Sequence, residues 1–141
     1  MIEYPPIREL VPHGDGILQL ERLIEWAPGR AVCTMRVAAS SRLVANGQLE
    51  GVLLLEPMAQ TVAACLGYEA YRAGQGVRVG MVVACRELQA FVPHVAVGTA
   101  LRIRVSRVRG SDSASHFDCE VLHEERVIAS ATMTLVHAGT R

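Results

Sequence analysis

The sequence has no lysine, few aromatic residues and no net charge, and these shortages narrow the classes of protein to consider. All fourteen basic residues are arginines, and fourteen acidic residues bring the formal net charge at pH 7 to zero. We attribute the missing lysine to genome composition rather than to phosphate binding. A chain without a basic excess is not drawn to nucleic acid or anionic lipid by charge. Because 50% of the residues are hydrophobic, the composition predicts a globular protein.

The four cysteines show no sign of pairing. Cys33, Cys65, Cys85 and Cys119 are widely spaced, and no Cys-x-x-Cys motif occurs. No secretory signal precedes them, so we expect small core residues in a reduced cytoplasm. The histidines lack metal-ligand spacing, and no phosphate-binding or dinucleotide-binding loop is present. The sequence therefore predicts neither a metal nor a cofactor.

The length of 141 residues suits one domain over residues 1–141 with a single core. The most apolar stretch begins at Gly51 and is interrupted by Glu56, Pro57 and Gln60. It is too polar for a membrane span, so we expect a soluble protein. The stretch is nevertheless apolar on nearly every helical face, which predicts a buried helix from about Gly51 to Arg72. Pro57 either kinks this helix or marks a late start near Glu56.

Strand patterns flank the predicted helix on both sides. Residues 17–26 fit a strand or a helix, but the Pro-Gly turn and the alternating residues 31–38 that follow favour a hairpin. Residues 40–48 read as a loop. Five segments after the helix read as strands: "RVGMVVACREL", "LQAFVPHVA", "TALRIRVSRVRG", "SASHFDCEVLHE" and "RVIASATMTLVH". This order predicts an α+β protein with one long helix wrapped by an antiparallel sheet of about five to seven strands.

Two motifs resemble a known family. The segment "EGVLLLEPMAQ" resembles the signature of the hot-dog-fold β-hydroxyacyl-acyl-carrier-protein dehydratases, in which Gly-Val, a catalytic acid and Ala-Gln recur at this spacing. Gly51, Val52, Glu56 and Gln60 fall in register, and the upstream "LVPHGDGILQLERLIEW" matches with His13. The segments after the helix resemble the aryl-polyene-type subgroup of predicted dehydratases. The resemblance covers nearly the whole chain and implies the hot-dog fold.

One departure concerns the catalytic base. Dehydratases of this family carry a histidine in a His-Phe-Pro segment before the helix, whereas "SSRLVANGQLEG" is shorter and has no histidine. His13 is a candidate replacement, although the family uses that position structurally. His94 is expected to be a residue at a strand end. The base is therefore expected to come from elsewhere, for instance from a partner subunit.

The resemblance assigns roles to the matching residues. A carboxyl buried among leucines prefers its neutral form, because complete burial raises such a pKa by roughly 3–5 units. Glu56 is therefore the expected general acid, with a structural hydrogen bond or helix cap as the alternative. Gly51 and Val52 are expected to admit the thioester to the free amides of the helix start. Gln60, one turn after Glu56, is expected to orient the acid or bind the substrate hydroxyl, or else to be a polar core residue.

Three functions fit these residues. The first is a dehydratase of fatty acid or polyene biosynthesis, which acts on a 3-hydroxyacyl thioester of acyl carrier protein or coenzyme A. The second is a hot-dog thioesterase, in which Glu56 activates water or attacks the thioester. The third is a non-catalytic hot-dog subunit that supports an active partner. A homodimer or heterodimer is expected in each case, since an open sheet edge requires cover.

Overall fold

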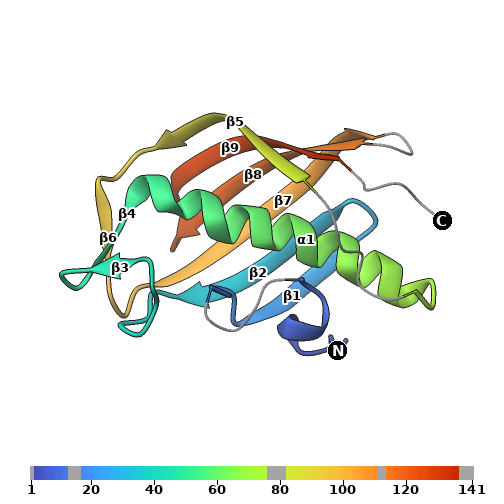
Figure 1. Cartoon of the computed structure of the whole chain (residues 1–141), viewed down its shortest axis with the longest axis horizontal. Helices are drawn as coiled ribbons and strands as arrows, with labels where there is room; N and C mark the ends of the chain where they lie inside the picture. The colour runs from blue at the N-terminus through green and yellow to red at the C-terminus, as the bar shows by residue number, and fades with distance from the viewer. Residues whose placement is uncertain (1, 13–16, 76–81, 111–113, 137–141) are drawn as a thin grey trace.

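An antiparallel sheet curls around one long helix (Figure 1). The computed structural model describes residues 2–12, 17–75, 82–110 and 114–136. The predicted α+β architecture, with one long helix wrapped by an antiparallel sheet, is confirmed.

The larger sheet has six strands in the order β1-β2-β7-β8-β9-β5. In that order they are Arg22–Ala27, Arg30–Arg36, Ala100–Gly110, Ala114–His123, Arg126–Val136 and Val82–Ala90. Every neighbouring pair is antiparallel. The predicted hairpin before the helix is β1 and β2, so the helical alternative for residues 17–26 is wrong. The strands β1 and β5 lie at the two edges of the sheet.

A second, three-stranded sheet corrects two sequence predictions. It consists of β3 (Val44–Ala45), β4 (Gln48–Glu50) and β6 (His94–Ala96). Residues 40–48 therefore hold a small hairpin rather than only a loop. Its turn is Asn46-Gly47, whose φ angles of 55° and 74° suit a two-residue hairpin. The predicted strand over residues 88–96 divides between β5 and β6, and therefore between the two sheets.

The helix begins late, which was one of the two predicted outcomes. A 3₁₀ turn, η2 (Gly51–Leu54), leads into α1 (Leu55–Arg72). Pro57 therefore lies in the first turn of α1, where backbone N–H groups have no intrahelical acceptor and a proline costs nothing in hydrogen bonding. The helix stops before Gly74, whose φ of 76° ends the helical path.

The core lies between α1 and the inner face of the larger sheet. α1 crosses this face over β2 and β7 (Figure 1). Fully buried side chains come from α1 and from the strands: Met58, Val62, Met35, Ile103, Phe117 and Met133. By length and composition α1 with η2 would suit a membrane span, but 72% of the relevant window is buried inside the molecule. The segment is a core helix.

Three of the four cysteines belong to this core, as predicted. Cys33, Cys65 and Cys119 are buried and free, and burial raises the pKa of Cys33 and Cys65 to about 12. The prediction is wrong for Cys85, which is free but exposed on the edge strand β5. It pairs in register with the buried Met133 of β9.

The N-terminal segment closes the far half of the helix. A short 3₁₀ turn, η1 (Ile7–Glu9), brings Leu10 against α1 at Gly67. A Cβ atom on residue 67 would lie 1.8 Å from the carbonyl oxygen of Leu10. Glycine is required here because the two backbones touch.

Candidate functional site

An apolar pocket lies at the start of the helical segment, where the sequence predicted a substrate site. Its volume is about 390 Å³, and it is formed by the end of β5, the connection to β6, and η2. The lining residues are Glu50, Gly51, Val52, Ala90, Phe91, Val92 and Pro93. Val52 and Phe91 are each about half exposed, at 51% and 52%. The sequence analysis missed Phe91, although the Pro-containing break after its strand was a usable signal.

Gly51 contacts the protein's own backbone. Its N–H donates to the carbonyl oxygen of Pro93 at 2.8 Å, and a Cβ atom at this position would lie 2.1 Å from the carbonyl oxygen of Val92. The close approach that requires glycine is thus made by the β5-β6 connection. The 3₁₀ turn begins at Gly51 with Glu50 as its N-cap, so the i→i+3 pattern gives the Leu53 amide an acceptor and leaves the Val52 amide without one inside the helix.

Glu56 is the second residue of α1 and the only acidic residue of its first turn. Its side chain is half-buried, so the complete burial predicted from its leucine neighbours is not reached in a single chain. Neither predicted structural role is seen, because Glu56 makes no hydrogen bond and no ion pair with any residue that the structure describes. A half-buried carboxylate without a partner is available for chemistry.

Gln60 is fully buried and its amide is fully engaged. The side-chain Nε2 donates to the carbonyl oxygen of Ile17 at 2.8 Å, and Oε1 accepts from the N–H of Gln19 at 2.7 Å. The residue therefore joins α1 to the segment that leads into β1. This geometry fits the polar core alternative rather than direct contact with substrate.

The histidines occupy separate places. His13 lies outside the described residues, so its predicted role stays a prediction. His94 is exposed on β6, opposite Glu50 in the ladder, and the fold thus brings it next to the start of the helix. His116 shares a hydrogen bond with Thr134, with 2.9 Å between Nδ1 and Oγ1. Among the described residues, no group of three or more His, Cys, Asp or Glu side chains is placed to hold a metal.

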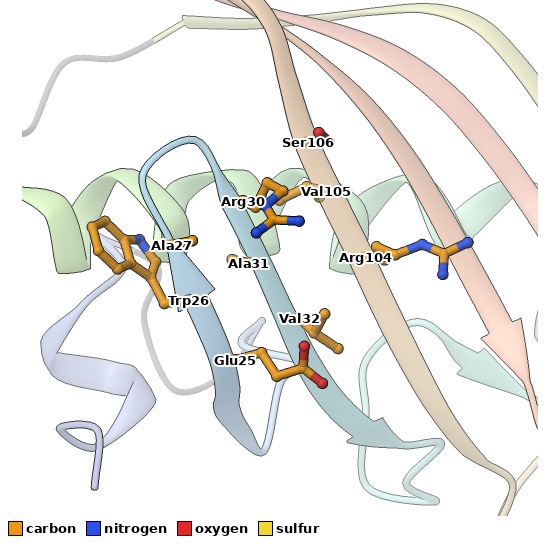
Figure 2. Close-up of a pocket in the computed structure, with 9 residues that line it drawn as sticks. All are labelled: Glu25, Trp26, Ala27, Arg30, Ala31, Val32, Arg104, Val105 and Ser106. Atoms are coloured by element: carbon orange, nitrogen blue, oxygen red, sulfur yellow. The ribbon is translucent and has the colours of Figure 1, made fainter. Parts of the chain in front are cut away.

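A second groove lies on the opposite face of the sheet (Figure 2). Its polar side chains include Glu25 of β1, Arg30 of β2 and Arg104 of β7, and α1 runs behind the strands in this view. Arg104 is already paired with Glu120 of β8. None of the predicted site residues that the structure describes lines this groove, so we place the candidate site at the start of the helix.

Comparison with known proteins gives a family match over most of the chain. Residues 5–139 match the model of the family described as "ApeP-like: ApeP dehydratase". The chain is also 26% identical over 143 residues to the 3-hydroxyacyl-[acyl-carrier-protein] dehydratase FabZ of Lactobacillus helveticus, with 96% of this chain and 93% of that protein covered.

Solved structures share the fold. A chain of the dehydratase heterocomplex ApeI:P from Xenorhabdus doucetiae matches with a TM-score of 0.91 and 19% identity, covering 98% of this chain and 94% of that one. A hypothetical thioesterase with coenzyme A from Streptococcus pneumoniae matches with a TM-score of 0.59 and 20% identity, covering 85% and 87%. At these identities the matches establish the hot-dog fold alone.

Proposed function

Because the chain belongs to the ApeP-like dehydratase family, we propose that it removes water from 3-hydroxyacyl thioesters with Glu56 as the proton donor. One observation carries the assignment of Glu56. Its half-buried carboxyl stands in the first turn of α1 without a partner among the described residues, four residues after Val52, which lines the apolar pocket. A carboxyl engaged in neither a hydrogen bond nor an ion pair with these residues can interact with a bound substrate.

The proposed reaction needs three groups. A base takes the proton from the α-carbon, and the electrons of that C–H bond form the double bond to the β-carbon. The bond from the β-carbon to the hydroxyl oxygen breaks, and the proton of Glu56 goes to this oxygen, which leaves as water. Donors to the thioester oxygen stabilise the enolate-like charge that develops. We assign this last role to the amide of Val52, because the amide of Gly51 is bonded to Pro93 and that of Leu53 belongs to the i→i+3 pattern of η2.

We propose that the base comes from a second hot-dog subunit. The hairpin before η2 has no histidine where the resembled dehydratases carry theirs. The edge strand β5 is paired only with β9, and its residues Ala84 to Glu87 are exposed. A subunit paired to this edge would lie beside the pocket and would bury Glu56 further. The similarity to a chain of a dehydratase heterocomplex supports this arrangement.

The proposed substrate carrier is an acyl carrier protein. The named relative FabZ acts on substrates held by such a carrier, and the half-exposed Val52 and Phe91 offer an apolar rim to an incoming acyl chain. Coenzyme A is the alternative carrier. We place the reaction in the cytoplasm, which agrees with four free cysteines.

The test is the conversion of a 3-hydroxyacyl thioester by the purified chain, alone and with a hot-dog dehydratase subunit. Glu56→Gln keeps the shape but cannot donate an acidic proton, so enoyl product should fall by about 10²–10⁴-fold. His13→Ala and His94→Ala serve as single controls, and an equal loss in either variant with an intact fold would identify a base in this chain. Parent-like turnover by the Glu56→Gln variant would disprove the assignment.

A thioesterase is the second candidate function. It is favoured by the solved thioesterase of the same fold and by a carboxylate that needs no histidine partner to attack a thioester. The same assay separates the two functions, because hydrolysis releases a free thiol and dehydration does not. If the Glu56-dependent product is free thiol, the chain is a thioesterase. If neither product forms with or without the partner, Glu56 is not a catalytic residue and the chain is a supporting subunit.

A further inference from the structure

A series of hydrogen bonds connects residues 17–19, the loop 41–43 and Gln60, which lies one turn of α1 after Glu56. Leu43 donates its N–H to Oγ of Ser41 at 3.2 Å, and this hydroxyl donates to Oε1 of Gln19 at 3.1 Å. Gln19 donates its own N–H to Oε1 of Gln60 at 2.7 Å. The carbonyl of Ile17 accepts from Nε2 of both glutamines, at 3.2 Å from Gln19 and 2.8 Å from Gln60.

The chain of bonds is consistent in its donors and acceptors. The Ser41 hydroxyl has one proton, which it donates to Gln19, and its oxygen accepts from the N–H of Leu43. Both polar atoms of the Gln60 amide are used, and this residue is 0% exposed. Because the hydrogen bonds share these groups, the loss of one bond should weaken the neighbouring bond.

The connected segments flank the proposed site. Gln60 lies four residues after Glu56, which is about 6 Å along the helix axis. The loop 41–43 leads through the β3-β4 hairpin directly into η2, which lines the pocket. It is also part of the stretch that would carry the histidine in the resembled dehydratases. The bonds therefore fix this stretch relative to the helical turn that carries the proposed acid.

We propose that Ser41, Gln19 and Gln60 form a positioning relay that holds the loop 41–43 against α1 and thereby sets the rate of the proposed reaction. The inference rests on the proposed function. Ser41 is the residue that decides it, because its hydroxyl is the link between the loop and Gln19. The relay residues act through Glu56 and the pocket and do not contact the substrate.

The relay is tested with Ser41→Ala, Gln19→Ala and the double variant, which break the same link from either side. Both residues are half-buried, and Gln60 stays intact in all three proteins. Each single variant should lower kcat by about two- to tenfold, the factor that one hydrogen bond contributes, with KM unchanged. The double variant should be no slower than Gln19→Ala, because linked residues are not additive. Ser41→Thr keeps the hydroxyl and should restore kcat.

Ser106→Ala is the matched control, since it removes a half-buried hydroxyl from the outer face of β7 and should leave kcat as in the parent. A parent-like kcat in Ser41→Ala, a loss expressed only in KM, or strictly multiplicative losses in the double variant would overturn the relay. Amide hydrogen exchange tests the relay without turnover. Gln19→Ala should speed exchange at Leu43, although the acceptor of Leu43 is untouched, while amides in β8 stay protected.

Unchanged exchange at Leu43 in Gln19→Ala would also overturn the relay. Absence of enoyl product from the parent, alone and with its partner subunit, would count against the proposed function. In that case the exchange at Leu43 still decides whether the three residues act as one unit.

Discussion

The two ends of the helical segment are built in opposite ways. At its start, η2 contributes half-exposed Val52 to an open pocket, and half-buried Glu56 follows four residues later in the first turn of α1. At its end, Tyr68 packs edge-on against Trp26 and Tyr4, with ring centroids 5.0 Å apart in both pairs. Arg72 lies over the Trp26 ring, and the indole donates to the carbonyl of Cys65 at 2.9 Å. One end is closed by its own side chains and the other is left open.

The glutamates of α1 show what this difference means. Glu69, near the closed end, forms an ion pair with Arg107 at 3.0 Å. Arg107 is in turn placed over the ring of the fully buried Phe117. Glu56, at the open end, has no partner within residues 2–12, 17–75, 82–110 and 114–136. The same residue type on the same helix is thus a structural element at one end and a candidate reactive group at the other.

The largest effect is expected from glycine substitutions, which test whether both ends depend on backbone contact. Gly67→Ala would put a methyl group 1.8 Å from the carbonyl of Leu10, and Gly51→Ala would put one 2.1 Å from the carbonyl of Val92. Backbone atoms cannot move aside cheaply, so each should lower the free energy of unfolding by about 1–3 kcal/mol or more. Urea unfolding measures both, with Gly98→Ala as control, because nothing lies within 4 Å of that position.

Gly98 has a φ of 94°, so the stability lost in Gly98→Ala measures backbone strain alone, without a steric clash. If Gly67→Ala costs no more than Gly98→Ala, the N-terminal segment is not held against the helix as described. In Gly51→Ala the loss should extend to turnover, since the shifted connection carries the pocket residues Phe91 and Val92.

A smaller effect is expected from Glu69→Gln, the counterpart of Glu56→Gln. Arg107 and Glu69 are partly exposed, so the loss of their ion pair should cost no more than about 1 kcal/mol of stability. Turnover should be unchanged, because Glu69 lies at the opposite end of the helix from the pocket. Thermal unfolding and the enoyl assay measure the two quantities. A loss of turnover in Glu69→Gln comparable to that in Glu56→Gln would erase the distinction between the ends.

The smallest effect is expected in thiol labelling, which compares the open edge with the closed core. The thiolate is the reactive form, and burial raises the pKa of Cys33 and Cys65 to about 12. Only Cys85 is exposed, so one thiol per chain should react with an alkylating reagent at pH 8, and four after denaturation. Burial also raises the pKa of Cys85, so the native reaction should speed up as pH rises.

Labelling also reports on the proposed interface. Cys85 lies in β5, the edge at which we propose the partner subunit, and a bound subunit should slow its reaction. Equal labelling rates with and without a bound partner would place that partner elsewhere on the molecule.

The sequence predicted the long elements better than it predicted how the start of the helix is assembled. The helix from Gly51 to Arg72 was visible because apolar residues dominate each of its faces, and the alternation of Leu101, Ile103 and Val105 revealed β7. The Asn46-Gly47 turn was also readable as a hairpin signal, but the two-residue strand before it was too short to recognise.

Other features depend on contacts that no local pattern encodes. The resemblance pointed to Gly51, but only the structure shows that its amide is taken by Pro93, some forty residues later. The relay joins residues 19, 41 and 60, whose spacing follows no helical or strand period. The exposure of Cys85 escaped prediction because an edge strand and a central strand share one pattern, and the position of β5 in the sheet order is a property of the whole fold.

The open edge of β5 has a consequence for the level at which this protein can be expressed without aggregating. A strand whose outer edge has no partner strand is a template for unwanted strand addition, and charged Arg86 and Glu87 give it only local protection. If the proposed partner subunit covers this edge, chains made in excess of that partner would be removed by aggregation or proteolysis. The scarcer of the two subunits would then set the amount of the pair, so their synthesis would have to be balanced.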